Sequence, residues 1–158
     1  TLGLDYVVAD LGTPDGCTLA VKETQDRLGP VAILVCNHGI GSAHERVIWE
    51  QEPELWRETM RINLDGPYFL SRLVVKDMIE QGYGRVVFTS STAGQVAEYA
   101  GSAYNSSKHG LLGLMRSVAQ DAGPHNVTSN AVLPGWVKTA GSSQLTATRK
   151  RSRARPKR

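Results

Sequence analysis

Residues 84–91 read Gly-Arg-Val-Val-Phe-Thr-Ser-Ser, and residues 104–108 read Tyr-Asn-Ser-Ser-Lys. The first run contains β-branched and aromatic residues after glycines, which predicts a short buried strand that ends in hydroxyl side chains. The second run opens an apolar pattern at helical spacing, formed by Leu111, Leu112, Leu114, Met115, Val118 and Ala119. We therefore expect a strand, a glycine-bearing loop and a helix, around which the rest of the chain is arranged.

Three side chains of this unit indicate proton-transfer chemistry. Tyr104 and Lys108 are four residues apart, so one helical turn places the phenol and the amine on the same side. Ser91 stands at the carboxyl end of the strand, where open α/β sheets bind their ligands. Free tyrosine loses its proton near pH ~10, and a neighbouring cation lowers that pKa toward the range of a general acid or base. The ordinary alternatives are a solvated helix face and a Ser-Ser turn, and the combination of all three residues favours a site.

Four segments extend this pattern along the chain. They are Cys36-Asn37-His38-Gly39, Asn63, the set of Ser91, Tyr104 and Lys108, and Pro134-Gly135-Trp136-Val137-Lys138-Thr139. Together they resemble the motifs of the short-chain dehydrogenase/reductase family, in the single-domain subdivision similar to the 3-oxoacyl-carrier-protein reductases. The resemblance runs from Tyr6 to Thr139, which is most of the chain.

The resemblance implies an α/β fold, a partial Rossmann-type doubly wound parallel sheet, in a domain of residues 1–139. It also implies an oxidoreductase that uses NAD or NADP to interconvert a small-molecule carbonyl and its alcohol. The catalytic residues implied by the family motifs are Asn63, Ser91, Tyr104 and Lys108. The implied cofactor-binding residues are Asp10, Asn37, Gly39, Tyr104, Lys108, Val137 and Thr139. A homodimer or homotetramer would assemble through the helices at residues 65–81 and 104–122.

The other elements are expected to alternate between strand and helix, which predicts a parallel sheet. Expected strands are Tyr6–Asp10, Val31–Cys36 and Val127–Leu133. The second of these is a nearly continuous apolar run, as in a strand buried on both faces. Expected helices lie between Thr13-Pro14 and Gly29-Pro30, from Pro53 onward, and from Tyr68 to Ile79 after an interruption at Gly66-Pro67. For Asp10, a contact with adenine, implied by the resemblance, and a loop-capping role both remain open.

The sequence also departs from the family pattern. It has no Gly-rich turn before Tyr6, and the residue that separates NAD from NADP is missing with that turn. The chain begins with Thr1, so we expect a fragment whose sheet core is formed by residues 31–36, 84–89 and 127–133. Tyr6–Asp10 would then be docked on the strand at 31–36 or loose. His38 replaces a small residue close to the expected cofactor position and could crowd it.

Composition bounds the class of protein. The chain has 158 residues, 41% hydrophobic and 21% charged, as in a globular protein, and it has no apolar run of membrane-spanning length. The two cysteines have neither metal nor disulfide spacing, which indicates a reducing, cytoplasmic compartment. The four histidines are scattered and interpreted as structural or solvated, so no metal site is expected.

The basic residues are concentrated at one end. Seven of the 18 lie in residues 149–158, which leaves 11 basic residues against 15 acidic ones in residues 1–148. We expect residues 140–158 to be a disordered tail and nucleic acid not to be a partner. The alternative hypothesis is a non-enzymatic truncated chain whose basic tail binds nucleic acid or anionic surfaces.

Overall fold

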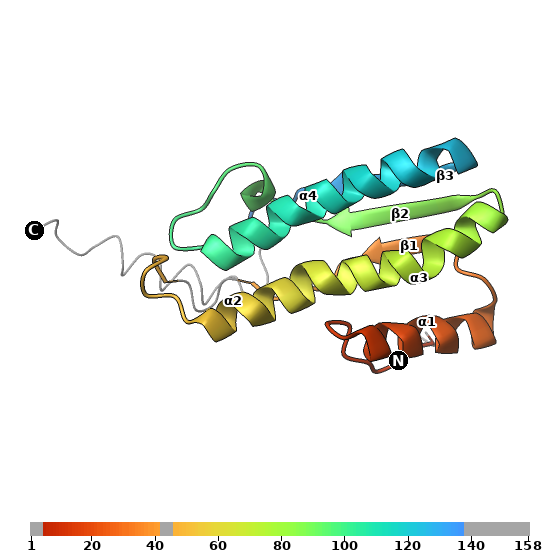
Figure 1. Cartoon of the computed structure of the whole chain (residues 1–158), viewed down its shortest axis with the longest axis horizontal. Helices are drawn as coiled ribbons and strands as arrows, with labels where there is room; N and C mark the ends of the chain where they lie inside the picture. The colour runs from red at the N-terminus through yellow and green to blue at the C-terminus, as the bar shows by residue number, and fades with distance from the viewer. Residues whose placement is uncertain (1–4, 42–45, 138–158) are drawn as a thin grey trace, which may run out of the picture.

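Three parallel strands form the sheet of this computed structural model, which describes residues 5–41 and 46–137 (Figure 1). The strands are β1 (Ile33–Cys36), β2 (Gly84–Thr89) and β3 (Val127–Val132), in the spatial order β1-β2-β3. In the parallel register, Val35 lies opposite Val87 and Phe88 lies opposite Ala131. The prediction of an α/β fold with a parallel sheet is confirmed, and the three expected core strands are present.

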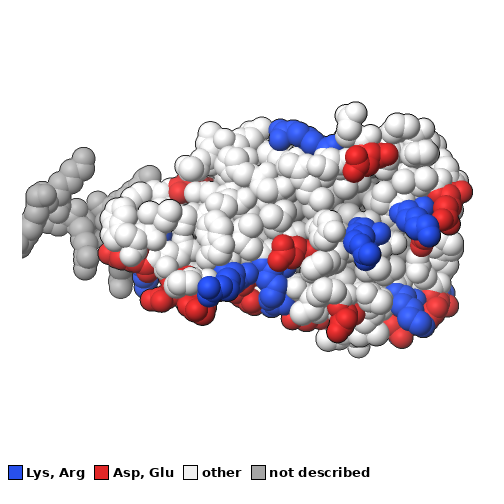
Figure 2. All heavy atoms as spheres, in the orientation of Figure 1, with Lys and Arg blue, Asp and Glu red and all other residues white. Residues whose placement is uncertain are grey.

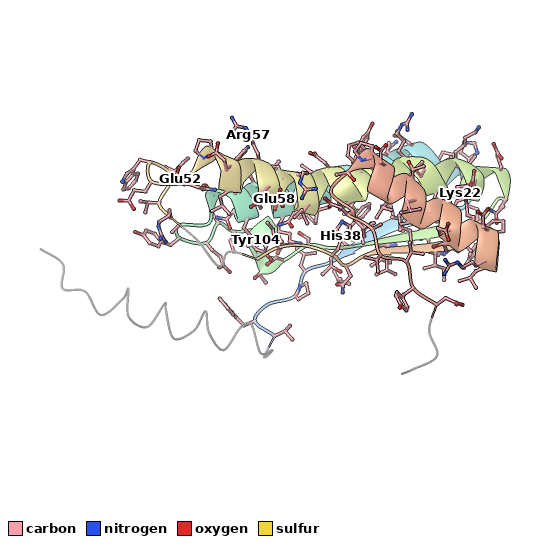
Figure 3. The ribbon with its side chains drawn as sticks, turned by 90° about the horizontal axis from the view of Figure 1, so that it is seen from below. Lys22, His38, Glu52, Arg57, Glu58 and Tyr104 are labelled. Atoms are coloured by element: carbon pink, nitrogen blue, oxygen red, sulfur yellow. The ribbon has the colours of Figure 1, made fainter. Side chains whose placement is uncertain are left out.

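The helices of the described residues lie on one face of this sheet (Figure 3). They are α1 (Pro14–Leu28), α2 (Pro53–Met60), α3 (Gly66–Glu80) and α4 (Ser102–Ala122). A π-helical segment, η1 (Arg61–Asp65), joins α2 to α3, and short 3₁₀ turns lie at Thr92–Gly94 (η2) and Gly123–His125 (η3). Figure 1 shows α2 and α3 as one continuous rod beside α4, with α1 along the other side of α3. The predicted interruption at Gly66-Pro67 is therefore wrong, because the π-helical segment carries the helix through the proline.

Local sequence signals set the ends of α1 as expected. The Thr13 side chain accepts a hydrogen bond from the Gly16 amide, and Pro14 occupies the first turn, where its missing N–H costs nothing. Gly29 ends the helix with φ of 85°, a conformation that residues with a Cβ rarely adopt. The local chemistry of these residues therefore sets where the helix begins and ends.

The hydrophobic core fills the space between the sheet and the helical layer. Phe88 and Val86 of β2 are fully buried there, packed with Val74 and Met78 of α3 and Leu111 of α4. On the outer side of the helices, acidic and basic side chains are interspersed (Figure 2). Several of them form ion pairs within a single helix, such as Arg27 with Glu23 and Lys76 with Glu80. The helical layer therefore separates an apolar interior from a mixed-charge surface.

Strand β1 is covered on one side only. Cys36 is buried, but Ile33 and Val35 are 59% and 57% exposed. The expectation that this strand is buried on both faces is therefore wrong. Side chains alternate between the faces of a strand, and no helix of the described residues covers the face to which Ile33 and Val35 point. An apolar run predicts the strand but not what covers it.

Residues 5–10 do not form a strand. They pass beside α1, where Arg27 Nη1 donates to the Tyr6 carbonyl at 3.5 Å, and Tyr6 and Val8 are exposed. The strand prediction for Tyr6–Asp10 is wrong, because a strand needs a hydrogen-bonded neighbour and this segment has none among the described residues. Of the two alternatives expected for this segment, docked or loose, pairing with the strand at 31–36 is not found, since the sheet of the described residues consists of β1, β2 and β3. Thr139 and the basic tail lie in residues 138–158, outside the described part of the chain.

The described residues include no helix that combines the length and the apolar character needed to cross a bilayer.

Amide hydrogen exchange should follow this topology. Residues 5–10 should exchange much faster than Gly84–Thr89, because β2 is hydrogen-bonded on both sides and residues 5–10 have no ladder. Hydrogen exchange read by NMR or mass spectrometry would measure this, with Ile33–Cys36 as an intermediate edge strand. Equally slow exchange in residues 5–10 and β2 would show that the segment has a sheet partner in solution.

Candidate active site

Lys108 lies at the centre of the site residues. Its side chain is almost fully buried, and Nζ donates a hydrogen bond to the Thr89 carbonyl at the end of β2, at 2.9 Å. Burial disfavours the ammonium form and lowers the pKa of Lys108 to about 8. The amine therefore faces the carboxyl edge of the sheet with remaining protons to donate.

Tyr104 precedes Lys108 by one turn of α4, as the spacing predicts. The Lys108 Nζ lies 5.6 Å from the centroid of the Tyr104 ring. Tyr104 is partly exposed, whereas Lys108 is buried below it. The pair thus presents the Tyr104 phenol to a ligand and keeps the Lys108 ammonium behind it.

The serines after β2 have separate roles. Ser90 is buried and its hydroxyl donates to the Lys108 carbonyl at 2.8 Å, which fixes the end of the strand against α4. Ser91 is partly exposed, and its oxygen accepts from the Ala93 amide at 3.1 Å, which caps η2. That bond uses a lone pair of the Ser91 oxygen, so its O–H remains a donor for a ligand oxygen.

Asn63 lies in η1 and is completely buried. Its Oδ1 accepts from the Ile40 amide at 2.8 Å, and its Nδ2 donates to the Ile40 carbonyl at 3.0 Å and to Ser107 Oγ at 3.2 Å. The side chain therefore joins the turn after β1 to η1 and α4. A polar residue in a helix is usually exposed, so the helical pattern alone does not indicate a site at Asn63. Its position between the other family motifs in the sequence is what identifies it.

Gly39 permits the close approach of these groups. A Cβ at this position would lie 3.1 Å from Asn63 Oδ1 and 3.5 Å from Lys108 Nζ. The structure thus brings Gly39, Asn63, Tyr104 and Lys108 together at the carboxyl ends of β1 and β2. Asn37 is exposed in the same turn.

Asp10 lies apart from this group, in the loop before α1. Its carboxylate accepts from Arg61 Nη1 at 2.8 Å and from the Gly12 amide at 2.9 Å. The Gly12 hydrogen bond and then the Arg61 guanidinium hold the pKa of Asp10 below its usual value. The capping role is thus formed, while the adenine contact stays a prediction. Val137 is exposed after β3, and the predicted site residue Thr139 lies outside the described residues.

Several residues of this network were missed by the sequence analysis. Ile40 and Thr89 contribute only backbone atoms, which leave no signal in the sequence. Ser107 links Asn63 to the Tyr104 carbonyl, to which its hydroxyl donates at 2.8 Å. Its position one residue before Lys108 was a signal that spacing arguments could have used. Among the described residues, no group of three or more His, Cys, Asp or Glu side chains is arranged to hold a metal ion.

Comparison with known proteins decides the family. Residues 3–150 match the family described as short chain dehydrogenase. The chain belongs to this family. Acetoacetyl-CoA reductase of Paracoccus denitrificans is 33% identical over 125 residues, covering 79% of this chain and 51% of the relative. The NAD(+)-dependent 2-dehydro-3-deoxy-L-rhamnonate dehydrogenase of Sphingomonas sp. is 35% identical over 141 residues, covering 89% and 56%.

A solved structure that matches this member of the short-chain dehydrogenase family is also that of a dehydrogenase. The gluconate 5-dehydrogenase of Burkholderia cenocepacia, in complex with NADP and tartrate, superposes with a TM-score of 0.83 at 27% identity. The match covers 90% of this chain and 55% of that one. The chain thus spans about half the length of the relatives that it matches.

The buried amine predicts a specific pH dependence of stability. The folded pKa of Lys108 is about 8 and the unfolded value is about 10.4, so the unfolded chain binds more protons between these values. The cost of holding this lysine in the fold should therefore disappear as the pH rises from about 8 to about 10. Denaturant unfolding of the wild type and Lys108→Met should show the wild type gaining stability relative to the variant across this window. A constant difference would contradict the depressed pKa.

Proposed function

We propose that this chain carries the proton-transfer site of an NAD(P)-dependent oxidoreductase that interconverts a carbonyl and an alcohol. The observation that carries the proposal is the placement of the Lys108 amine 5.6 Å from the centroid of the Tyr104 ring, beside Gly39 and Asn63. A buried cation behind a partly exposed phenol is the arrangement that a tyrosine general acid or base requires. Family membership and the order of the motifs support the same reaction class.

The residues present fit the nicotinamide-ribose part of a dinucleotide. Lys108 Nζ can donate to ribose hydroxyls, and Gly39 leaves no side chain over the amine. Asn37 and Val137 are exposed at the same edge of the sheet. When bound, the cofactor would supply or accept the hydride at the substrate carbon. Two relatives of known structure are described as an NADP complex and an NAD+-bound enzyme, so the choice between the two cofactors stays open.

The protein side chains would handle the oxygen and the proton. In the direction of reduction, Ser91 O–H donates to the carbonyl oxygen and Tyr104 gives its proton to the same oxygen as the alcohol forms. Lys108 stabilises the resulting phenolate by its positive charge. In the direction of oxidation, the phenolate of Tyr104 takes the proton back, so the same residues serve both directions.

Asn63 would extend this proton path through its backbone. In an α-helix its carbonyl would accept from the amide of residue 67, but Pro67 has no N–H. Pro67 thus removes the α-helical donor that would compete with a water molecule for this carbonyl. The side-chain amide of Asn63 is hydrogen-bonded to Ile40 and Ser107, which supports a fixed position for the Asn63 backbone carbonyl.

The substrate is proposed only as a class. The relatives are described as an acetoacetyl-CoA reductase and a 2-dehydro-3-deoxy-L-rhamnonate dehydrogenase, so the proposed class is a small carbonyl compound or the matching alcohol. We further propose one domain for residues 1–139, a cytoplasmic location, and assembly as a homodimer or homotetramer through α3 and α4. The basic-tail alternative falls on residues outside the described part of the chain and stays a hypothesis.

Replacing the matching segment of the Paracoccus denitrificans reductase with this chain would test the chemistry. The reductase then supplies the parts of the chimera that lie outside the 125-residue match. Acetoacetyl-CoA reduction by NADPH or NADH, followed by absorbance, should appear in the chimera. It should fall by about 10²-fold or more in Tyr104→Phe, because the ring stays and only the transferred proton is lost.

The control is Tyr83→Phe, since Tyr83 immediately precedes β2 and so lies at the opposite end of that strand from Thr89 and the site. This variant should keep the activity of the parent chimera. A folded chimera that binds cofactor but is inactive, or one that loses no activity on the Tyr104→Phe substitution, would overturn the proposed function.

A further inference from the structure

The loop between β2 and α4 begins and ends at residues of the proposed site. It follows Ser91, the proposed donor to the substrate oxygen, and enters α4 two residues before Tyr104. Figure 1 shows the loop at the carboxyl ends of the strands. Its Val96 and Tyr99 side chains are 65% and 80% exposed, so they are available for contact with a ligand. In the proposed reaction, the loop therefore borders the space that the substrate occupies.

Both ends of this loop are held by neighbouring segments. At its start, the Thr92 amide donates to the Pro134 carbonyl and the Val96 amide donates to the Thr92 carbonyl, both at 3.1 Å. At its end, Gly101 pairs with Arg46 in a single parallel β-bridge. The part of the loop between these contacts is held in another way.

Asn105, the residue after Tyr104, holds the centre of the loop. Its Nδ2 donates to the Glu98 carbonyl at 2.8 Å, and its Oδ1 accepts from the Glu98 amide at 3.2 Å. The side-chain amide thus satisfies both backbone polar groups of one residue, as a neighbouring strand would. Asn105 is buried, with 8% of its surface exposed, so loss of these bonds would leave polar groups unpaired at a cost. The contact therefore specifies one position of the loop relative to α4.

The backbone next to this contact has an unfavourable conformation. Ala100 has φ of 59°, in the left-handed region that residues other than glycine rarely adopt. Such a conformation persists only where the surrounding contacts impose it. Ala100 lies between Glu98, which is bonded to Asn105, and Gly101, which forms the β-bridge. Without the Asn105 contact, the loop would therefore relax to another conformation.

We propose that Asn105 is a positioning residue, which fixes the loop between Ser91 and Tyr104 through the Glu98 backbone and so shapes the substrate side of the site. This consequence for catalysis rests on the proposed function. The proposed cofactor contacts come from other segments, such as the turn after β1. Loss of the Asn105 contact should therefore weaken substrate binding and leave cofactor binding unchanged.

Hydrogen exchange measured by NMR tests the contact without any activity. In the wild-type chain, the Glu98 backbone amide and the Asn105 side-chain amide should both exchange slowly. Asn105→Leu keeps a side chain of similar size and removes both polar atoms. In this variant the Glu98 amide should exchange about tenfold faster, the scale of one lost hydrogen bond. Fast exchange of the Asn105 side-chain amide in the wild type would overturn the proposal even if the variant fails to fold, and so would unchanged Glu98 exchange in the folded variant.

The chimera with the Paracoccus denitrificans reductase gives the catalytic readout. Asn105→Leu should raise the KM for acetoacetyl-CoA by about tenfold, on the same scale, and leave the KM for the cofactor unchanged. A substitution that only destabilised the fold would lower the active fraction, and so the apparent kcat, without changing either KM. An unchanged KM for acetoacetyl-CoA, or an equal rise of both KM values, would overturn the proposal.

Gln81→Leu is the matched control. Gln81 Nε2 also donates to a backbone carbonyl, that of Asp77 at 3.0 Å, but Gln81 is exposed at the end of α3, just before β2 begins. This variant should change neither the exchange of the Glu98 amide nor either KM, and an effect equal to that of Asn105→Leu would overturn the assignment to Asn105. Failure of the proposed function would look different: the chimera would be inactive while Glu98 and Asn105 keep the slow exchange described.

Discussion

The buried amide of Asn63 is the interaction on which the site depends. Its oxygen and nitrogen close a pair of hydrogen bonds on the Ile40 backbone, and the nitrogen also reaches Ser107 on α4. Three segments distant in sequence thus meet at one fully buried side chain. Such groups are costly to leave unpaired, so the turn after β1, η1 and α4 are fixed relative to one another. The position of Lys108 against Gly39 follows from this arrangement.

Features that depend on neighbouring residues in the sequence could be predicted. Thr13 and Gly29 set the ends of α1 through their own backbone and side-chain chemistry, and the strands of the core follow from apolar runs. Features that depend on a distant partner could not. Tyr6–Asp10 has the composition of a strand but no neighbour to pair with among the described residues. At Gly66-Pro67 the sequence indicates a break, whereas the π-helical segment moves the hydrogen bonding by one residue and keeps the rod intact.

The candidate site shows the same division. Spacing alone placed Tyr104 and Lys108 on one side of α4, because four residues make about one helical turn. Spacing could not show that Ser90 ties β2 to the Lys108 backbone, or that Arg61 reaches Asp10 across fifty-one positions. His38 was interpreted as a scattered histidine that could crowd a cofactor. Its ring approaches the start of α3 so closely that a Cβ at Gly66 would lie 2.8 Å from Nε2, and no local pattern in the sequence reveals this approach.

In the part of the chain that the structure describes, strand β1 combines an unpaired edge with an exposed apolar face, which favours association between chains in solution. Ile33 and Val35 project from a strand with a hydrogen-bonded neighbour on one side only among the described residues. Such an edge is a template for strand addition by another chain. Folding is first order in chain concentration, whereas addition between chains is second order. Loss of native protein by association should therefore be faster in concentrated solutions, and dilution should slow it.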